Sequence, residues 1–197
     1  LKVVSQIYGG KILAEAEVKG AHAIVSVLAG ASPAGNGRLA GEPAIEDVSP
    51  PAPLDQLRMR FRRLLRPEGG DVDITKEAVL VSVGRGIGSQ DNIPVVQELA
   101  DALGAAVSCS RPIVDQGWLP KTRQVGKSGM NVKPKLYLAL GVSGAPEHLE
   151  GMNNSDLIIA VNTDPKAPIF DVAHYGAEID ALDLLPCLVE ALSAKKG

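Results

Sequence analysis

The chain has 197 residues, of which 45% are hydrophobic and 22% charged, as in globular proteins that bury a core. This length suits one α/β domain with an appendage, or two small domains. The formal net charge of −3 disfavours general affinity for nucleic acid. No apolar run approaches the roughly 20 residues that a membrane-spanning helix needs, and no signal peptide is visible.

The two cysteines, Cys109 and Cys187, both lie within apolar patterns. We interpret them as a buried pair of free thiols, which suits a soluble protein of a reducing compartment, the cytoplasm or the mitochondrial matrix. The chain begins at Leu1 instead of methionine, so we expect it to be a processed product or a fragment.

Residues 1–75 are expected to form a small β-rich appendage. Apolar residues alternate along residues 11–18, which predicts a strand, and residues 23–28 predict another. Residues 30–53 are rich in proline and turn formers, which predicts a surface loop. In residues 57–62 apolar side chains alternate with arginine. The period of two favours a solvated edge strand over a basic amphipathic helix.

From about residue 76 the pattern changes to strands alternating with helices. Four short apolar runs predict strands, at residues 79–83, 105–109, 136–140 and 157–161. A helix is expected over residues 92–103, ended by Gly104. This alternation predicts an α/β fold with a doubly wound, Rossmann-like parallel sheet in residues 76–197.

A last helix is expected between residues 180 and 194. Its predicted buried stripe consists of Leu182, Leu185, Val189 and Leu192. Pro186 fits this helix only if the helix begins near Asp183, because proline is tolerated in the first turn.

Polar segments rich in glycine follow the predicted strands. The carboxyl ends of parallel strands share one edge of a sheet, so these segments are expected to converge there: residues 84–91, 110–131, 141–148 and 162–169. The connection at 110–135 is long and weakly periodic, and such ordered connections are usually functional. This edge is therefore the predicted ligand site.

Two of these segments have features of anion-binding loops. Residues 84–88 follow a strand and precede a helix, so they form either an anion site with Arg85 or a plain tight turn. Residues 124–129 resemble a phosphate loop, but Lys121 stands where the G-x-x-x-x-G-K-[ST] pattern needs glycine. An NTPase is therefore not expected. The dinucleotide pattern G-x-G-x-x-G is also absent, which disfavours a nicotinamide dehydrogenase.

His148 follows the small-residue turn at 141–145, and we expect it to contact a ligand, whereas His22 and His174 are expected to be structural. No cysteine and histidine cluster has metal-ligand spacing, so no metal site is predicted. No convincing pairing of nucleophile and base is evident either, so no catalytic residue is predicted. This pattern favours cofactor binding over covalent catalysis.

Seven motifs occur in a characteristic order along the chain: 83–88, Ser110-Arg111, 115–118, 124–126, 141–145, His148 and 162–170. Together they resemble the C-terminal FAD-binding domain of electron transfer flavoprotein α subunits. The resemblance is dense over residues 78–192. It is looser over residues 1–75, where residues 6–11 resemble the linker that leaves the family's N-terminal domain.

The resemblance implies an FAD-binding electron carrier that is not itself an enzyme. It would accept electrons from flavoprotein dehydrogenases and pass them to a downstream acceptor such as a quinone oxidoreductase, in complex with the family's β subunit. The cofactor-binding residues that the resemblance implies are Arg85, Ser110, Arg111, Gln124, Val125, Gly126, Ser128, Ser143, Gly144, His148, Asn162, Asp164 and Asp180.

The resemblance also implies an extended FAD along the strand ends. Arg85, Ser110 and Arg111 then correspond to positions near the isoalloxazine, and Ser143 and His148 to the pyrimidine side and the phosphates. Gln124, Val125, Gly126 and Ser128 correspond to the ring or ribityl region, and Asn162 and Asp180 to the adenosine half. Cations near the ring favour its reduced, anionic forms.

The chain departs from the family at two site positions. Ser128 stands where the family often has threonine, and Pro146-Glu147 precedes His148 where the family commonly has an apolar residue and glutamine. A carboxylate there is expected to weaken phosphate binding or to shift the flavin potential. The alternative hypothesis is a module that binds AMP or NAD and serves assembly or regulation without redox activity. Whether the chain is part of a larger subunit or a standalone relative stays open.

Overall fold

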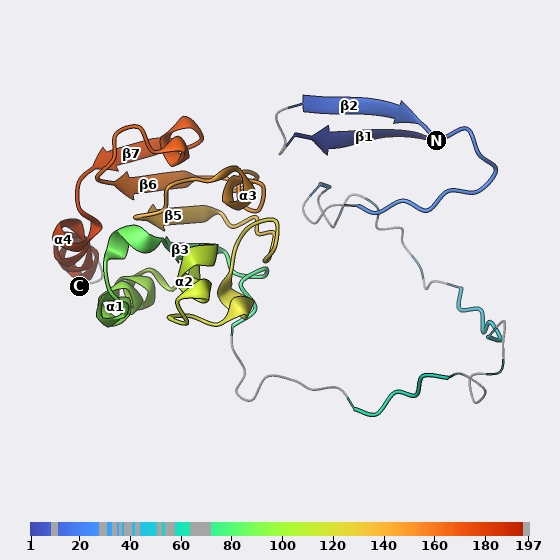
Figure 1. The fold of residues 1–197 in the computed structure, drawn as a ribbon, viewed down its shortest axis with the longest axis horizontal. Coiled ribbons are helices and arrows are strands. Elements are labelled where there is room, and N and C mark those ends of the chain that lie inside the picture. Colours follow the sequence, from blue (N-terminus) through green and yellow to red (C-terminus); the bar gives the residue numbers. More distant parts are fainter. Residues whose placement is uncertain are drawn as a thin grey trace. The chain divides into compact units, whose positions relative to one another are not determined.

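The computed structural model describes residues 1–8, 12–27, 31–32, 35, 37, 41, 44–50, 53, 58–63 and 72–194. The chain divides into two units, one of residues 1–31 with 72–197 and the other of residues 32–71. The α/β architecture predicted from the sequence is confirmed in residues 72–194, where a parallel sheet is flanked by helices (Figure 1).

The sheet of this domain has five parallel strands in the order β4-β3-β5-β6-β7. Their bounds are β3 Val79–Val83, β4 Ala106–Cys109, β5 Leu136–Leu140, β6 Ile158–Asn162 and β7 Tyr175–Glu178. Four of them match the predicted strands within a residue, whereas β7 carries no apolar run and was not predicted. Val83 at the end of β3 pairs in register with Cys109 on one side and Leu140 on the other. The strand order therefore reverses at β3.

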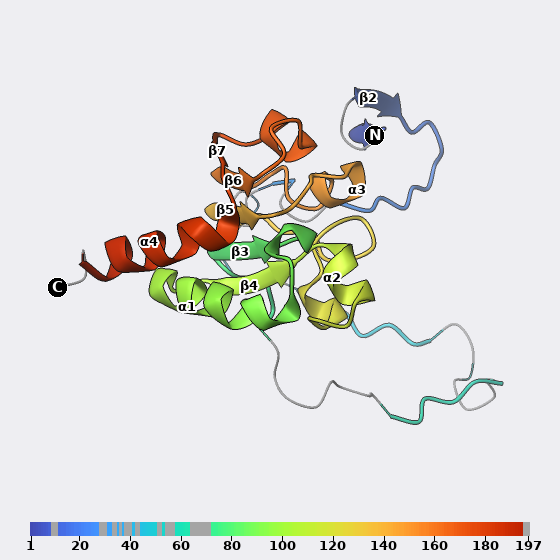
Figure 2. The same ribbon diagram turned by 60° about the vertical axis from the view of Figure 1, so that its left-hand side comes forward.

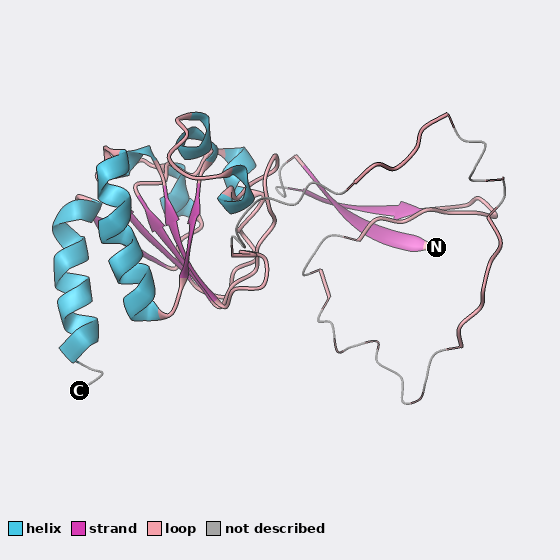
Figure 3. Cartoon of the chain, turned by 90° about the horizontal axis from the view of Figure 1, so that it is seen from below, coloured by secondary structure: helices cyan, strands magenta, loops and turns pink. Residues whose placement is uncertain are grey.

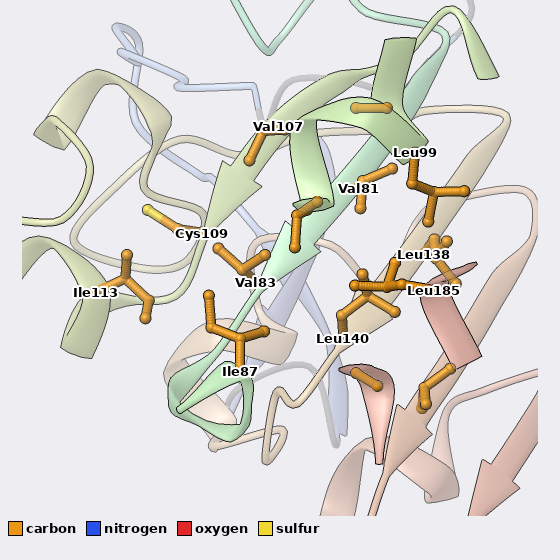
Figure 4. Packing of buried hydrophobic residues seen from close by; sticks show 14 residues of the cluster. Val81, Val83, Ile87, Leu99, Val107, Cys109, Ile113, Leu138, Leu140 and Leu185 are labelled. Carbon is orange, nitrogen blue, oxygen red and sulfur yellow. The ribbon is translucent and has the colours of Figure 1, made fainter. Parts of the chain in front are cut away.

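Two long helices cover one face of the sheet, α1 (Ile93–Leu103) and α4 (Ala181–Ala194). They run alongside each other in two views (Figure 2 and Figure 3). Alternate strand residues point toward them because side chains of a strand alternate between its faces. Val81, Val83 and Leu140 thus join Leu99 of α1 and Leu185 of α4 in one buried cluster (Figure 4).

The opposite face of the sheet is covered mainly by connecting segments. Leu80, Tyr137 and Ile158 from the strands pack in a second cluster with residues of those segments, among them Val125 and Met152. The shorter helices α2 (Arg111–Asp115) and α3 (Pro146–Leu149) also lie in the connections. Single 3-10 turns occupy Arg85–Ile87, Gln90–Asn92, Lys121–Arg123 and Pro168–Asp171. Both sheet faces are therefore buried, as parallel strands require.

The helix ends show which local predictions hold. Gly104 ends α1 in the left-handed conformation at φ 64°, as predicted. Helix α4 begins at Ala181, where the Asp180 carboxylate accepts a hydrogen bond from the Leu182 backbone N–H at 2.9 Å. Pro186 therefore lies inside the helix, contrary to the expected start near Asp183. Its ring is exposed, and because proline has no N–H, the helix lacks the hydrogen bond that residue 186 would donate to the Leu182 carbonyl.

Helix α4 confirms its predicted buried stripe but shows that the prediction for the two cysteines is wrong. Leu185 is fully buried, and Leu182, Val189 and Leu192 pack against the same cluster, so the predicted stripe is confirmed. Cys109 is buried but Cys187 is exposed. The prediction of a buried pair is therefore wrong, because Cys187 follows Leu185 by two positions and falls on another side of the helix.

The N-terminal residues form an antiparallel hairpin of β1 (Lys2–Ile7) and β2 (Ile12–Glu17), with Ile7 opposite Ile12. The strand predicted at 11–18 is confirmed over residues 12–17; Val18 lies just beyond the end of β2, and Lys11 lies outside the described residues. The strand predicted at 23–28 is wrong for residues 23–27, and Leu28 is not described. Alternation marks a tendency, but a strand also needs a hydrogen-bonding partner.

Within the described residues, the edge strand predicted at 57–62 also lacks a hydrogen-bonding partner. Residues 58–62 are described and pair with no strand in the described part of the chain, so this prediction is also wrong there; Leu57 lies outside it. Among the helices that the structure describes, none is long and apolar enough to cross a membrane.

Candidate functional site

A cavity of about 470 Å³ lies beyond the carboxyl ends of β3, β4, β5 and β6. Residues from all four predicted loops line it, including Arg85 after β3, Ser110 after β4, Ser143 after β5 and Asn162 at the end of β6. The chain passes from β3 to β4 on one side and later to β5 on the other, so the cavity opens at the point where the strand order reverses. Open α/β sheets bind ligands at such switch points.

The cavity gathers eleven of the thirteen residues that the sequence singled out. Those eleven are Arg85, Ser110, Arg111, Gln124, Val125, Gly126, Ser128, Ser143, Gly144, His148 and Asn162. Asp164 and Asp180 are not in the lining. Their carboxylates accept backbone N–H groups two residues ahead, at Lys166 and Leu182, so each shapes a local turn or caps a helix. Contact of any of the thirteen with FAD stays a prediction.

Eight further residues line the cavity that the predicted set did not include: Gly86, Pro112, Asp115, Lys127, Gly141, Val142, Ala145 and Glu147. All eight lie in the predicted loops, within four positions of a predicted site residue. The sequence signal for Glu147 was its departure from the family pattern. Lys127 lies in the segment that resembles a phosphate loop, and that resemblance is the sequence signal that points to it.

Three cationic side chains surround the cavity, from Arg85, Arg111 and Lys127, and all three residues are exposed. Arg111 Nε lies 3.4 Å from a carboxylate oxygen of Asp115, one turn along α2. Lys127 Nζ lies 3.9 Å from a carboxylate oxygen of Glu150. Because exposed ion pairs are weak, the cations stay available to an anionic ligand.

Gln124 positions the hydroxyl of Ser128. The Gln124 side chain is only 4% exposed, and its amide nitrogen donates a hydrogen bond to Ser128 Oγ at 3.0 Å. The hydroxyl proton of Ser128 is then left to donate elsewhere. Since both residues line the cavity, this pair offers a directed donor to a ligand.

The segment after β5 offers main-chain donors. The backbone N–H groups of residues 143–145 make no hydrogen bond to the part of the chain that the structure describes. Asn162 holds this segment in place, because its amide nitrogen donates to the Val142 carbonyl at 2.9 Å. Free amides at the end of a parallel strand suit phosphate or carbonyl oxygens of a ligand.

His148 lines the cavity from the side of the second core cluster. It is 6% exposed, and its Nε2 lies 2.9 Å from the phenol oxygen of Tyr137. Its Nδ1 is buried and has no hydrogen-bond partner within the described residues. Burial lowers the pKa of His148 to about 4, and the Val125 backbone opposes this only in part. The imidazole is therefore neutral at pH 7.

Tyr137 extends this polar contact into the sheet. Its ring is fully buried, and its hydroxyl forms a 2.7 Å hydrogen bond with the hydroxyl of Ser82 on β3. Burial raises the pKa of Tyr137, so it stays a neutral phenol. Ser108, opposite Ser82 on β4, also buries its hydroxyl. Sequence reasoning passed over these residues because each lies in an otherwise apolar strand.

The other histidine that the structure explains is His174. Its Nδ1 accepts a hydrogen bond from the Ile158 backbone N–H at 2.9 Å, which ties the start of β6 to the segment before β7 and confirms a structural role. Within the described residues, no group of three or more histidine, cysteine or carboxylate side chains is placed to hold a metal ion.

Comparisons with known proteins agree with this geometry. The model of the electron transfer flavoprotein FAD-binding domain matches residues 73–153. A protein named electron transfer flavoprotein subunit alpha, from Mycobacterium leprae, is 42% identical over 98% of this chain and 60% of its own length. The protein of that name from Methylophilus methylotrophus is 47% identical over 79% of this chain and 48% of its own length.

A third relative is Protein FixB from Azotobacter vinelandii, which is 54% identical over 60% of this chain and 33% of its own length. The chain thus spans 60% or less of the length of each of these three relatives. The identity with FixB is higher than with the other two proteins, but it applies to a shorter part of this chain.

Proposed function

Since this chain belongs to the electron transfer flavoprotein α family through its FAD-binding domain, we propose that it holds FAD in the strand-end cavity and acts as an electron carrier. We place that domain at residues 76–197 and treat residues 1–75 as an appendage. The observation that carries the proposal is the convergence of four separate loops, with their cations, hydroxyls and free amides, on one cavity at the switch point.

The donor set of the cavity fits a flavin dinucleotide. The exposed cations of Arg85, Arg111 and Lys127 suit its negative charge, and the free amides of residues 143–145 suit its oxygen atoms. Nδ1 of His148 is a buried polar atom that makes no hydrogen bond of full geometry to the described residues, next to the Val125 backbone that partly supports the ring's charge. We therefore assign these groups to FAD binding.

Bound FAD supplies reversible uptake and release of electrons, which the twenty amino-acid side chains do not provide. In this proposal the chain's own residues do three things. Arg111 places a positive charge beside the ring, Ser128 and His148 direct hydrogen bonds at it, and the apolar cluster beneath His148 excludes water. No covalent step on a substrate is part of this role.

An FAD titration of the purified full chain tests the proposal. We expect an optical spectrum of bound flavin, or quenching of flavin fluorescence on addition of FAD with one site per chain. A protein that carries no flavin and takes up none would overturn the proposal. Titration with AMP and NAD under the same conditions tests the non-redox alternative, which predicts tight binding of those nucleotides and negligible binding of FAD.

We also propose that the chain works with a second subunit, the β subunit that the family implies, and exchanges electrons with flavoprotein dehydrogenases and a downstream quinone oxidoreductase. The two relatives named electron transfer flavoprotein subunit alpha support the electron-transfer role, and this chain spans 60% and 48% of their lengths. Purification of the untagged protein from its own cells, with identification of the chain and the cofactor that accompany it, is the direct test.

A further inference from the structure

We propose that Gly151 is a positioning residue for the cavity, although it is not part of the lining. Because Gly151 has no side chain, residues 124–130, here called the donor loop, pack directly on the turn that follows α3. The loop then holds the Ser128 hydroxyl at a fixed place in the cavity wall. The packing of the loop rests on contacts within this chain. Only the statement that the hydroxyl contacts FAD rests on the proposed function.

Gly151 meets the donor loop backbone to backbone. A Cβ on Gly151 would lie 2.5 Å from Gly126 N, 2.6 Å from Gly126 Cα and 3.1 Å from the Met130 carbonyl oxygen. All three are main-chain atoms, so no side chain can turn aside to make room. Gly151 is buried and is not among the described glycines with positive φ, so its own backbone conformation suits alanine. Only the closeness of the loop requires glycine here.

Hydrogen bonds hold the donor loop against α3 on both sides of this contact. The Lys127 N–H donates to the Glu147 carbonyl at 2.7 Å, and the Val132 N–H donates to the Gly151 carbonyl at 2.8 Å. The Gly151 N–H donates to the His148 carbonyl at 3.0 Å, which ties Gly151 itself to α3. The loop therefore cannot retreat from a larger residue 151 without stretching these bonds.

The donor loop is closed on itself, so a displacement at Gly126 reaches Ser128. The Met130 N–H donates to the Gln124 carbonyl at 2.7 Å, and the Gly126 N–H donates to the Met130 carbonyl at 3.1 Å. The Gln124 side chain donates to Ser128 Oγ at 3.0 Å. Gly126 and Ser128 both line the cavity. A push on the loop from residue 151 is therefore carried to the cavity wall.

The place of the Ser128 hydroxyl decides how well it donates to a ligand. A hydrogen bond weakens steeply when its distance or angle leaves the optimum, and groups of a binding site must be held within about 0.5 Å of their productive position. Ordinary contacts of a Cβ begin near 3.4 Å, so a Cβ 2.5 Å from Gly126 N requires a larger displacement than that. Gly151 thus acts on the ligand through Gly126 and Ser128.

The first experiment needs no cofactor. Amide proton–nitrogen NMR spectra of the nitrogen-15-labelled full chain are compared between the wild type and Gly151→Ala. We expect the amide signals of the donor loop to shift, those of Lys127 and Ser128 included. Gly176→Ala is the control, because its Cβ would crowd a Phe170 ring carbon at 2.7 Å outside the cavity lining, and it should leave these signals in place. Donor-loop signals that do not move in Gly151→Ala would overturn the proposal.

The second experiment uses the wild type and so decides even if Gly151→Ala does not fold. Hydrogen exchange measures whether the donor loop stays packed on α3. We expect the Lys127 amide to be protected to a similar degree as the Val132 amide, because each donates to a carbonyl of the segment beneath the loop. A Lys127 amide that exchanges as fast as an unbonded one would contradict the proposal.

The third experiment is a double-mutant cycle on FAD affinity. Ser128→Ala removes the hydroxyl and should weaken FAD binding about three- to tenfold. Gly151→Ala alone should weaken binding about threefold, but less than about twofold in the Ser128→Ala background, because the displaced hydroxyl is already gone. Equal losses in the two backgrounds would mean that Gly151 does not act through Ser128, and would overturn the proposal.

Failure of the proposed function gives a different pattern of results. If the wild type does not bind FAD, the electron-carrier proposal fails. The NMR and hydrogen-exchange results on the free chain then still decide whether Gly151 positions the donor loop.

Discussion

Gly86 and Gly141 touch backbone to backbone where β3 and β5 end. The Gly86 N–H donates to the Gly141 carbonyl at 3.0 Å, and Gly141 adopts φ +61°. A Cβ on Gly141 would lie 2.6 Å from Gly86 Cα. The two loops that flank the switch point are therefore joined through residues that cannot carry side chains.

The Gly141→Ala substitution should destabilise the fold for two reasons. Alanine is strained at this positive φ, and its Cβ has no room against the Gly86 backbone. We expect the free energy of unfolding to fall by about 3 kcal/mol, measured by urea denaturation. Gly117→Ala is the control, because Gly117 has φ +73° but nothing within 4 Å of a Cβ. Equal losses in the two variants would show that crowding plays no part.

The sheet and the position of the cavity could be predicted from the sequence, because a strand that is buried on both faces has a simple pattern, a short and nearly continuous apolar run. Val79–Val83 and Leu136–Leu140 are short apolar runs followed by glycine, and their length and flanking turn residues favour a buried parallel strand. The exposed strand β7, with its pattern Tyr-Gly-Ala-Glu, has no such run. It is defined by pairing with β6, which only the fold supplies.

The location of the candidate site could also be predicted from the sequence, but not all of its polar groups could. Loops that leave parallel strands had to meet at one edge, and they do. The polar groups under the cavity were not predictable, because Ser82 and Tyr137 lie 55 residues apart in sequence and meet through the register of β3 and β5. Asp180 differs from the other predicted residues, since its side chain caps a helix outside the cavity lining, and its contact with FAD stays a prediction.

The Glu147→Gln substitution should strengthen FAD binding. Glu147 is exposed and lines the cavity, so its charge opposes the phosphates of the proposed ligand. We expect the FAD dissociation constant to fall about threefold to fivefold at low ionic strength, and the gain to shrink in about 1 M salt. Flavin fluorescence quenching measures both.

Glu150→Gln is the matched control for this change. It removes the same charge two residues beyond His148, from a side chain that is paired with Lys127 and does not line the cavity. It should change FAD affinity less than Glu147→Gln does. An equal gain in both variants would mean that net charge matters and the position of Glu147 does not.

The Arg111→Ala substitution should lower the flavin potential. Its guanidinium lines the cavity and favours the more negative, reduced state of the proposed ligand. We expect a decrease of about 40 mV in a redox titration of the FAD-loaded chain. Asp115→Asn should act in the opposite direction, because the Asp115 carboxylate lies 3.4 Å from Arg111 Nε and offsets its charge. Potentials that do not move in opposite directions would exclude this role for the pair.

His148 should make the fold sensitive to acid in a defined window. Its pKa is lowered from 6.5 to about 4 in the folded chain, so the unfolded chain binds the extra proton first as the pH falls. Stability is therefore lost as the pH drops from about 6.5 to 4, and the loss is complete below both values. We expect the wild type to lose about 3 kcal/mol more between pH 7 and pH 4 than His148→Gln does, by urea denaturation. His22→Gln, at an exposed histidine, is the control and should follow the wild type. Parallel pH profiles for the wild type and His148→Gln would show that His148 is not held neutral by the fold.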